Sequence, residues 1–451
     1  MDEMEIVIVG AGPVGLMLAC ELGLAGVRPV LLDKRPERSA LPKANGFGGQ
    51  IVRVLALRGL LERFEKAASY AGRPPGFPFG GVPVGFAGLD VGLDLLAVQQ
   101  PQIERILEER AAELGIQVEW GAEVSSLDDL RARYVVGCDG ASSTVRELAG
   151  FDFPGTTEED VVRLGHFRSV RAKGIFGEAG QWRHTPRGQA IVTSLQPGIF
   201  VVGVREKGAQ PAGPMTVEEL RDSLRRVLDT DVELGEPIWV SRTVAQARQA
   251  TEYRRGDVFL AGDAAHLFPA GGSSLNVGLM DAVNLGWKLA AAVHGTAPDG
   301  LLDTYHAERH PAGAAALRQT RAQAALGRLD GEDGEALRGL LAELFAYDGP
   351  RRHLAEVLQG SDVRYGSAAH PLVGRLVPEL GVGAELLRAA KPFVVDFTGG
   401  VAGSIGIDVV RAEMPDPPAD TLLIRPDGYV AWAGADGLEE ALASVRKTGS
   451  S

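Results

Sequence analysis

The sequence predicts an α/β protein in which a Rossmann-like nucleotide-binding domain is combined with an α+β domain built on a mainly antiparallel sheet. Two observations lead to this prediction. The apolar run Ile6 to Val9 is followed directly by the glycine-rich turn Gly10-Ala11-Gly12-Pro13-Val14-Gly15, as at the start of a β-α-β nucleotide-binding unit. From about residue 161 to 254, apolar and polar residues alternate between glycines and prolines, which is typical of antiparallel strands.

The elements of the first unit follow in order along the chain. Gly15 to Gly26 is predicted to be a helix, and Arg28 to Leu32 the next buried strand. Residues 100–114 are predicted to form an amphipathic helix, because apolar residues recur at a spacing of three to four, namely Ile103, Leu107, Ala111 and Leu114. A further strand is expected at 133–137, and residues 281–358 return to helix.

Composition excludes several classes of partner. The chain has 451 residues, enough for two or three domains, and its formal net charge is −13. Basic residues occur mostly singly or in pairs, which argues against nucleic acid or an anionic membrane as a partner. The apolar start is too short for a signal peptide, and nowhere are about 18 apolar residues uninterrupted. We therefore expect a cytoplasmic protein.

The two cysteines provide neither a disulfide framework nor a metal site. Cys20 lies on the predicted apolar helix, and Cys138 ends a predicted apolar strand. Buried cysteine usually behaves as a small apolar side chain. We expect no metal and no catalytic thiol.

The glycine-rich turn predicts a resident dinucleotide. Its glycines permit a tight turn and a close approach of the backbone to a pyrophosphate. Asp33 ends the next strand, 18 residues after Gly15, where a carboxylate can accept hydrogen bonds from a ribose. NAD and FAD both fit this unit.

Two later segments favour FAD over NAD. In each, a predicted strand delivers an acidic residue into the same region of the sheet, first at Asp139-Gly140 and then at Gly262-Asp263. A second acid at a strand end suits a polyhydroxylated chain, and FAD has one in its ribityl linker. Either acid alone could also belong to an ordinary turn or helix cap.

These segments, in this order, resemble the flavin-dependent aromatic hydroxylases, the single-component FAD monooxygenases of the para-hydroxybenzoate hydroxylase type. The likeness is strongest to the bacterial branch that acts on polycyclic aromatic polyketides. Four features carry it: Gly10 to Gly15, Asp139-Gly140 with Ser143 and Arg146, Gly262 to Asn276, and Tyr305 to Pro311. The tail from Ile424 to Trp432 resembles the thioredoxin-like third domain of that branch, here without a Cys-x-x-Cys pair.

The resemblance implies three domains. The FAD-binding domain would comprise residues 1–75, 97–160 and 255–370. The substrate domain would comprise 161–254 together with the glycine- and proline-rich excursion 76–96, and the thioredoxin-like domain 371–451. The third domain is expected to serve packing or subunit contact.

The resemblance also implies the cofactor contacts. Gly10, Gly12 and Gly15 would seat the pyrophosphate, Asp33 the adenosine ribose and Asp263 the ribityl chain. Asp139 and Gly140 would serve both FAD and transient NAD(P)H, and Gln100 would approach the middle of the flavin. The complete predicted set is Gly10, Gly12, Pro13, Val14, Gly15, Asp33, Lys34, Arg35, Lys43, Gln100, Asp139, Gly140, Gly262, Asp263, Pro269, Gly271, Gly272, Ser273, Ser274, Leu275 and Asn276.

Four positions depart from the family pattern. Lys43 stands where the family commonly has an arginine. A lysine keeps the positive charge but cannot form the two parallel hydrogen bonds that a guanidinium makes with phosphate. Ser273-Ser274 replaces Gln-Gly beside the flavin, and Met280 replaces a glutamine. The connection from Glu123 to Arg133 is shorter than the usual β-hairpin. Either the sequence lacks residues that the natural protein has, or the protein has a natural deletion.

Three functions fit these features. The favoured one is hydroxylation of a polycyclic aromatic, polyketide-type substrate by O2 through a C4a-hydroperoxyflavin, with NADPH or NADH as reductant, in a monomer or homodimer. A second uses the same flavin chemistry for Baeyer–Villiger insertion or epoxidation. The third is a non-catalytic flavin-binding protein, for which Lys43 and Ser273-Ser274 are the only indications.

The sequence identifies no catalytic residue. Arg183, His184 and His266 are candidates only by residue type. We expect His266 to pack or to form local hydrogen bonds. Trp182 and Phe200 are candidates for lining the substrate cavity, although aromatic residues at alternating strand positions usually belong to the core.

Overall fold

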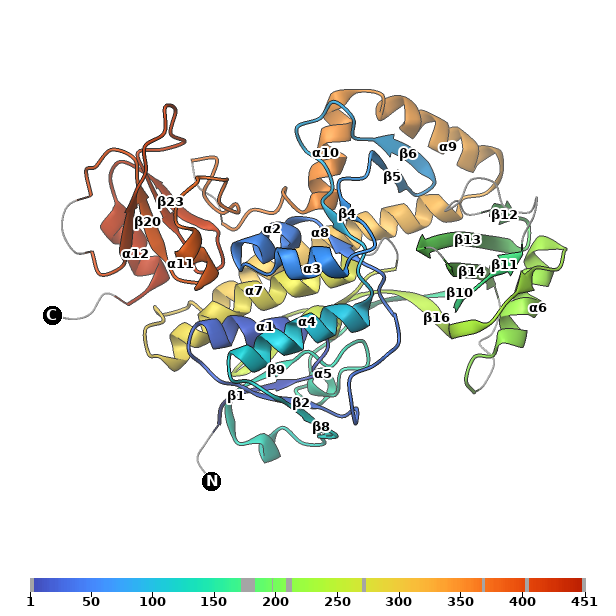
Figure 1. The fold of residues 1–451 in the computed structure, drawn as a ribbon, viewed down its shortest axis with the longest axis horizontal. Coiled ribbons are helices and arrows are strands. Elements are labelled where there is room, and N and C mark those ends of the chain that lie inside the picture. Colours follow the sequence, from blue (N-terminus) through green and yellow to red (C-terminus); the bar gives the residue numbers. More distant parts are fainter. Residues whose placement is uncertain are drawn as a thin grey trace.

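The computed structural model describes residues 4–171, 183–196, 198–207, 213–269, 273–366, 370–401 and 405–447. A parallel sheet with its helices forms the middle of the molecule (Figure 1). The antiparallel sheet extends from one side of it and the C-terminal unit lies on the other. The predicted fold class is confirmed.

The central sheet contains the predicted β-α-β unit. Its strand order is β17-β18-β9-β1-β2-β8, with all neighbours parallel except β17 and β18. The strands are β1 (Met4–Val9), β2 (Val30–Asp33), β8 (Val118–Trp120), β9 (Ala132–Gly137), β17 (Arg254–Arg255) and β18 (Val258–Leu260). Val9 pairs with Leu32 and Gly137, and Gly137 pairs with Leu260. The carboxyl ends of these four strands are therefore level with one another.

Helices cover this sheet, and α1 is buried among them. It contacts α4 and α7, and a Cβ atom on Gly286 of α7 would lie 2.5 Å from Glu21 Cβ. The glycine therefore permits the close approach of α1 and α7. The helices are α1 (Pro13–Leu24), α2 (Gln50–Leu57), α3 (Leu61–Ala67), α4 (Gln100–Glu113), α5 (Thr144–Leu148), α7 (Ser273–Val293) and α8 (Asp303–Arg328).

The second sheet has the predicted antiparallel pairing, in the order β12-β13-β14-β10-β16-β19. One face packs against α6 (Val217–Leu228) through a core that includes Phe167, Val202 and Leu220. Its strands are β10 (Gly155–Phe167), β12 (Arg183–Thr185), β13 (Gly188–Gln196), β14 (Ile199–Lys207), β16 (Pro237–Gln249) and β19 (His266–Leu267), beside the pair β11 (Val170–Arg171) and β15 (Glu233–Leu234). Strand β10 begins six residues before the predicted boundary at 161.

Residues 76–96, which the sequence analysis assigned to the same domain as residues 161–254, do not pair with this sheet. Strands β5 (Gly76–Phe79) and β6 (Val82–Gly85) pair only with each other. Their apolar side chains pack on α9 (Gly331–Leu344) and α10 (Asp348–Gln359). A small core formed with these helices therefore takes the place of sheet pairing. Nearby, β7 (Leu95–Leu96) lies between β3 (Phe47–Gly48) and β4 (Ala71–Gly72).

The C-terminal unit is a four-stranded sheet with the order β21-β20-β22-β23. It consists of β20 (Phe393–Asp396), β21 (Asp408–Arg411), β22 (Thr421–Ile424), β23 (Val430–Gly434), α11 (Ala384–Arg388) and α12 (Leu438–Val445). The predicted turn at Asp427-Gly428 joins β22 to β23, and Gly428 has a φ of +82°. This positive φ accounts for the glycine.

Buried ion pairs fasten the C-terminal unit to the central domain. Arg425 binds Glu308 of α8 through two hydrogen bonds of 2.7 and 2.9 Å. Arg58, the C-cap residue of α2, pairs with Glu21 of α1 at 2.7 Å and also donates to the Pro426 carbonyl at 2.8 Å. The third domain is therefore held by charged side chains that are largely buried.

The short connection before β9 contains one 3₁₀ turn, Asp128–Leu130, and a left-handed residue, Arg131, with a φ of +42°. Within residues 121–131 the structure has no hairpin. In the described part of the chain, no helix combines the length and apolar character that spanning a bilayer requires.

Candidate FAD site

Three segments that are far apart in sequence meet at one edge of the central sheet. The Cys138 N–H donates to the Val9 carbonyl at 2.7 Å, and the Ala261 N–H donates to the Gly137 carbonyl at 3.0 Å. The turns after β1, β9 and β18 therefore lie side by side. Ligands of open α/β sheets bind at this carboxyl edge.

The first turn has the shape that a dinucleotide pyrophosphate requires. Gly10 has a φ of +106°, and a Cβ atom there would lie 2.4 Å from the Cys138 carbonyl oxygen. A Cβ atom on Gly15 would lie 1.9 Å from the Gly10 oxygen, whereas one on Gly12 would meet nothing within 4 Å. Gly12 is the N-cap residue of α1 and has no side chain with which to form a capping hydrogen bond. Pro13 follows in the first turn of the helix. The backbone N–H groups of this turn can therefore receive phosphate.

Asp33 is fixed at the end of β2, beside this turn. Its carboxylate accepts hydrogen bonds from the Ala11 N–H at 2.8 Å and from the Arg35 backbone and guanidinium at 2.8 to 2.9 Å. Burial acts to raise the pKa of Asp33, but these hydrogen bonds outweigh it and lower the pKa. Asp33 is therefore a charged acceptor in the place that the sequence predicted for a ribose contact.

Arg35 and Gln100 belong to the same cluster. The Arg35 guanidinium lies 3.5 Å from Glu104 and 5.4 Å from the centre of the Trp120 ring. Gln100 opens α4, and its side chain donates to Glu104 at 2.8 Å. Its backbone N–H donates to the Ala44 carbonyl at 2.8 Å. The predicted cationic residues Lys34 and Lys43 have exposed side chains.

Asp139 organises the second turn. Its carboxylate accepts hydrogen bonds from the Ser143 hydroxyl at 2.5 Å and from the Val145 N–H at 3.1 Å. Arg146 donates to the Ala264 carbonyl at 3.1 Å and so links the second turn to the third. Gly140 has a φ of +86°, and a Cβ atom there would meet nothing within 4 Å.

The third turn presents Asp263 at the surface. Gly262 has a φ of +63°, and a Cβ atom on it would lie 2.9 Å from the side chain of Val14. The Asp263 side chain is exposed and accepts a hydrogen bond from the Ser274 hydroxyl. One of the serines that depart from the family pattern therefore contacts the predicted ribityl-binding acid.

The start of α7 completes the predicted set. Pro269 is buried, and α7 begins at Ser273. The Asn276 side-chain oxygen accepts a hydrogen bond from the Gly48 N–H at 2.9 Å, which joins α7 to β3. Gly271 and Gly272 lie outside the described residues, as does Trp182. The same holds for the side chains of His184 and Ser273.

A buried network beneath the third turn was not predicted from the sequence. The Asp281 carboxylate accepts hydrogen bonds from the Gly262 N–H at 3.1 Å and from Arg309 at 2.7 Å. His266 lies 2.8 Å from the same carboxylate. Burial acts to raise the pKa of Asp281, but Arg309 and His266 outweigh it and lower the pKa. The predicted local hydrogen bonding of His266 is thus confirmed.

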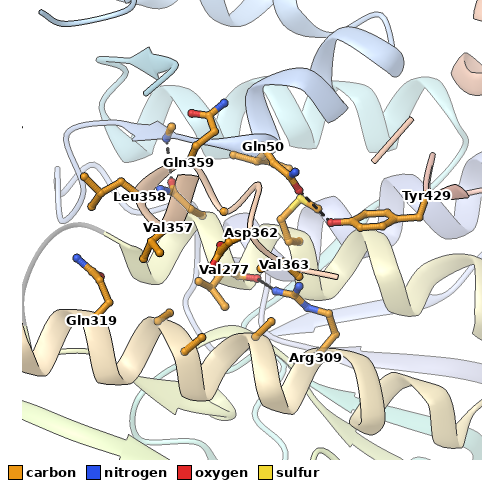
Figure 2. Close-up of a pocket in the computed structure, with 18 residues that line it drawn as sticks. Gln50, Val277, Arg309, Gln319, Val357, Leu358, Gln359, Asp362, Val363 and Tyr429 are labelled. Atoms are coloured by element: carbon orange, nitrogen blue, oxygen red, sulfur yellow. Dashed lines mark hydrogen bonds between the residues drawn. The ribbon is translucent and has the colours of Figure 1, made fainter. Parts of the chain in front are cut away.

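A cavity adjoins the start of α7 (Figure 2). It lies among α2, α7, α8 and α10. Asn276 and Met280, which the sequence assigned to the surroundings of the flavin, both line it. Phe200, a candidate for lining the substrate cavity, pairs with Phe167 at the far end of β10, and Arg183, a catalytic candidate by residue type, lies on β12. Neither of these two residues lines the cavity.

Two family models match the chain. The FAD binding domain matches residues 3–320, and the aromatic-ring hydroxylase C-terminal domain matches residues 370–448. The chain belongs to the FAD-binding aromatic-ring hydroxylases. This hydroxylase is therefore a flavin-dependent monooxygenase that binds FAD, and its glycine turns and carboxylates fit that cofactor.

Three comparisons extend over almost the entire hydroxylase. It is 38% identical to the 12-dehydrotetracycline 5-monooxygenase/anhydrotetracycline 6-monooxygenase of Streptomyces rimosus, covering 97% of this chain and 98% of the relative. It is 39% identical to the rifampicin monooxygenase of Streptomyces venezuelae, covering 96% of each. The structure of OxyS anhydrotetracycline hydroxylase from Streptomyces rimosus matches with a TM-score of 0.89 at 37% identity, covering 98% and 99%.

The alignment with the first relative spans 494 positions, whereas the hydroxylase has 451 residues. The relative therefore contains segments that have no counterpart here.

Proposed function

We propose that the protein hydroxylates a polycyclic aromatic, polyketide-type substrate in a reaction that uses FAD, NADPH or NADH, and O2. The observation that carries this proposal is the convergence of three nucleotide-binding turns beside a mainly apolar cavity. When bound, FAD supplies the redox chemistry, which side chains alone cannot perform. The protein's task is then to hold the cofactor, to place the substrate and to exclude water.

Each group of residues has a distinct part in holding the cofactor. The backbone N–H groups after Gly10 bind the pyrophosphate, Asp33 accepts hydrogen bonds from the ribose, and Asp263 accepts them from the ribityl hydroxyls. The Leu275 and Asn276 N–H groups, in the first turn of α7, face the flavin ring as donors. Donors placed where negative charge develops stabilise that charge. Asp139 and Gly140 help to receive NADPH or NADH.

The cavity supplies the apolar surroundings that a flat ring system needs. Ala312, Ala315 and Ala316 form one wall along α8. Their short side chains leave room for a broad ligand, and burying its apolar surface contributes about 25 cal/mol per Å². Exclusion of water from such a site strengthens the polar contacts that remain. We also propose that the protein functions in the cytoplasm as a monomer or homodimer.

Substrate-stimulated oxidation of NADPH or NADH tests this function. The purified protein should be yellow, and anhydrotetracycline, used as a probe, should accelerate oxidation of the nicotinamide at least several-fold. Full flavin content without stimulation by any polycyclic phenol would instead indicate a flavin-binding protein without turnover. Labelled O2 followed by mass spectrometry and NMR of the product distinguishes oxygen in a former C–H bond from Baeyer–Villiger insertion or epoxidation.

A further inference from the structure

The polar groups that line the cavity differ in how fully they are engaged. Gln50 accepts a hydrogen bond from the Tyr429 hydroxyl at 3.0 Å. Gln359 accepts one from the Asp94 N–H at 2.9 Å and donates to the Asp94 side chain at 2.7 Å. Asn276 accepts from Gly48, and Arg309 donates to Asp281, to the Val277 carbonyl and to Tyr365. Each of these side chains makes at least one hydrogen bond within the protein.

Asp362 is the exception. Asp362 lines the cavity, and within the described residues no other side chain donates a hydrogen bond to its carboxylate. Figure 2 labels Asp362 among the residues that line the cavity. Burial raises the pKa of Asp362, while His353 and Arg318 act to lower it. A carboxylate beside a cavity that receives no donor from another side chain is free to accept a hydrogen bond from a ligand there.

We propose that Asp362 is a specificity-determining residue whose carboxylate accepts a hydrogen bond from a hydroxyl group of the polycyclic ring in the cavity. This inference rests on the proposed function, because it takes the substrate to be a polycyclic phenol or enol. Such a ring would lie between the alanines of α8 and the apolar residues Val357 and Leu358, with its hydroxyl toward Asp362. The contact distinguishes a hydroxylated ring from one in which the oxygen is methylated.

A matched ligand pair measures this distinction. The probes are 2-hydroxyanthraquinone and 2-methoxyanthraquinone, and binding to the FAD-loaded protein is followed by absorbance or fluorescence titration. Hydrogen bonds to charged groups contribute about 1.5–3 kcal/mol, so the wild-type protein should bind the hydroxyl compound about 10-fold to 100-fold more tightly. Asp362→Ala should reduce this preference to less than about 3-fold, and Asp362→Asn should leave an intermediate value.

Two further variants serve as controls. Glu356→Gln removes one negative charge from the same part of α10 without altering the cavity lining, and it should keep the wild-type preference. Ala315→Phe fills the cavity, and it should weaken binding of both compounds by about 10-fold or more while FAD content stays unchanged. A purely structural role of Asp362 would weaken both compounds equally and leave their ratio intact.

The possible outcomes separate the two proposals. If Asp362→Ala retains the wild-type ratio, or if the wild-type protein binds neither probe, the role of Asp362 is wrong. If the ratio depends on Asp362 but no polycyclic phenol stimulates NADPH or NADH oxidation, the binding role stands and the proposed function fails. If turnover occurs with a ratio near one, the function stands and the inference about Asp362 fails.

Discussion

The Nε2 atom of His266 lies 2.8 Å from Oδ2 of Asp281, and neither side chain is exposed to solvent. Because Asp281 also accepts the Gly262 N–H, this buried pair is connected directly to the turn that carries Asp263. Arg309 supplies the compensating charge at 2.7 Å. The exposed acid of the flavin site therefore depends on a network in the core.

Asp281→Ala should destabilise the protein strongly, because it leaves the buried Arg309 without its carboxylate. Breaking a buried ion pair by removing one partner costs about 3–5 kcal/mol. Urea unfolding followed by circular dichroism measures the loss, and FAD content measures its effect on the third turn. Asp299→Ala, at a fully exposed side chain, is the control. Unchanged unfolding and full FAD content would contradict the assigned role.

Asp263→Ala should give folded protein that is largely free of FAD. The Asp263 side chain is exposed, so its removal leaves no buried group unpaired. Each lost hydrogen bond between the carboxylate and a ribityl hydroxyl would weaken binding by about 1.5–3 kcal/mol. The ratio of flavin absorbance to protein absorbance after purification gives the occupancy. A fully loaded variant would show that Asp263 does not hold the ribityl chain.

Glu308 should make the protein sensitive to acid. Burial acts to raise the pKa of Glu308, but Arg425 and Lys288 outweigh it and lower the pKa to about 2, below its usual value of 4.5. The resulting stability is fully present above about pH 4.5 and is lost as the pH falls toward 2, by up to about 1.4 kcal/mol per pH unit. Glu308→Gln should be less stable at neutral pH and should lack this part of the acid transition. Glu343→Gln, on the exposed face of α9, should retain it.

Lys288 should give a separate pH dependence on the alkaline side. Burial lowers the pKa of this fully buried ammonium to about 7, against 10.5 when exposed, although Glu308 acts to raise it. Between these values the unfolded state binds more protons, so stability should rise with pH by up to about 1.4 kcal/mol per unit. Lys288→Met removes the titrating ammonium and should therefore remove that rise. Glu308 keeps Arg425 and Asn284 as partners in this variant. A rise of equal size in wild type and variant would contradict this assignment.

Local sequence patterns were sufficient to predict the first half of the fold. The predicted strand at 6–9 is β1, the helix at 15–26 overlaps α1, and the helix at 100–114 is α4 within one residue at its end. These elements have continuous apolar runs or a clear helical period, so their own residues determine them. The excursion 76–96 was assigned to the substrate domain from its glycine- and proline-rich composition. In the structure its apolar side chains pack with Leu354 and Ala355, more than 250 residues later, and no local pattern indicates these partners.

The site could be predicted only where a motif is local. Gly10, Asp139 and Gly262 each follow a strand and Asp33 ends one, and the sheet brings them to one edge. Asp281 and Arg309 carry no comparable signal, since a carboxylate and a guanidinium on two long helices are usually solvent-exposed. Their pairing depends on the packing of α7 against α8, which only the structure reveals.

The adjacent residues Glu308 and Arg309 of α8 serve different domains. Glu308 binds Arg425 of the C-terminal unit, and Arg309 binds Asp281 beneath the flavin turn. The third domain is consequently not an interchangeable module. A chimaera that exchanges residues 371–451 with those of a relative must preserve the geometry of Arg425. Otherwise a change in the position of Glu308 will also displace its neighbour Arg309, and with it the cofactor loop.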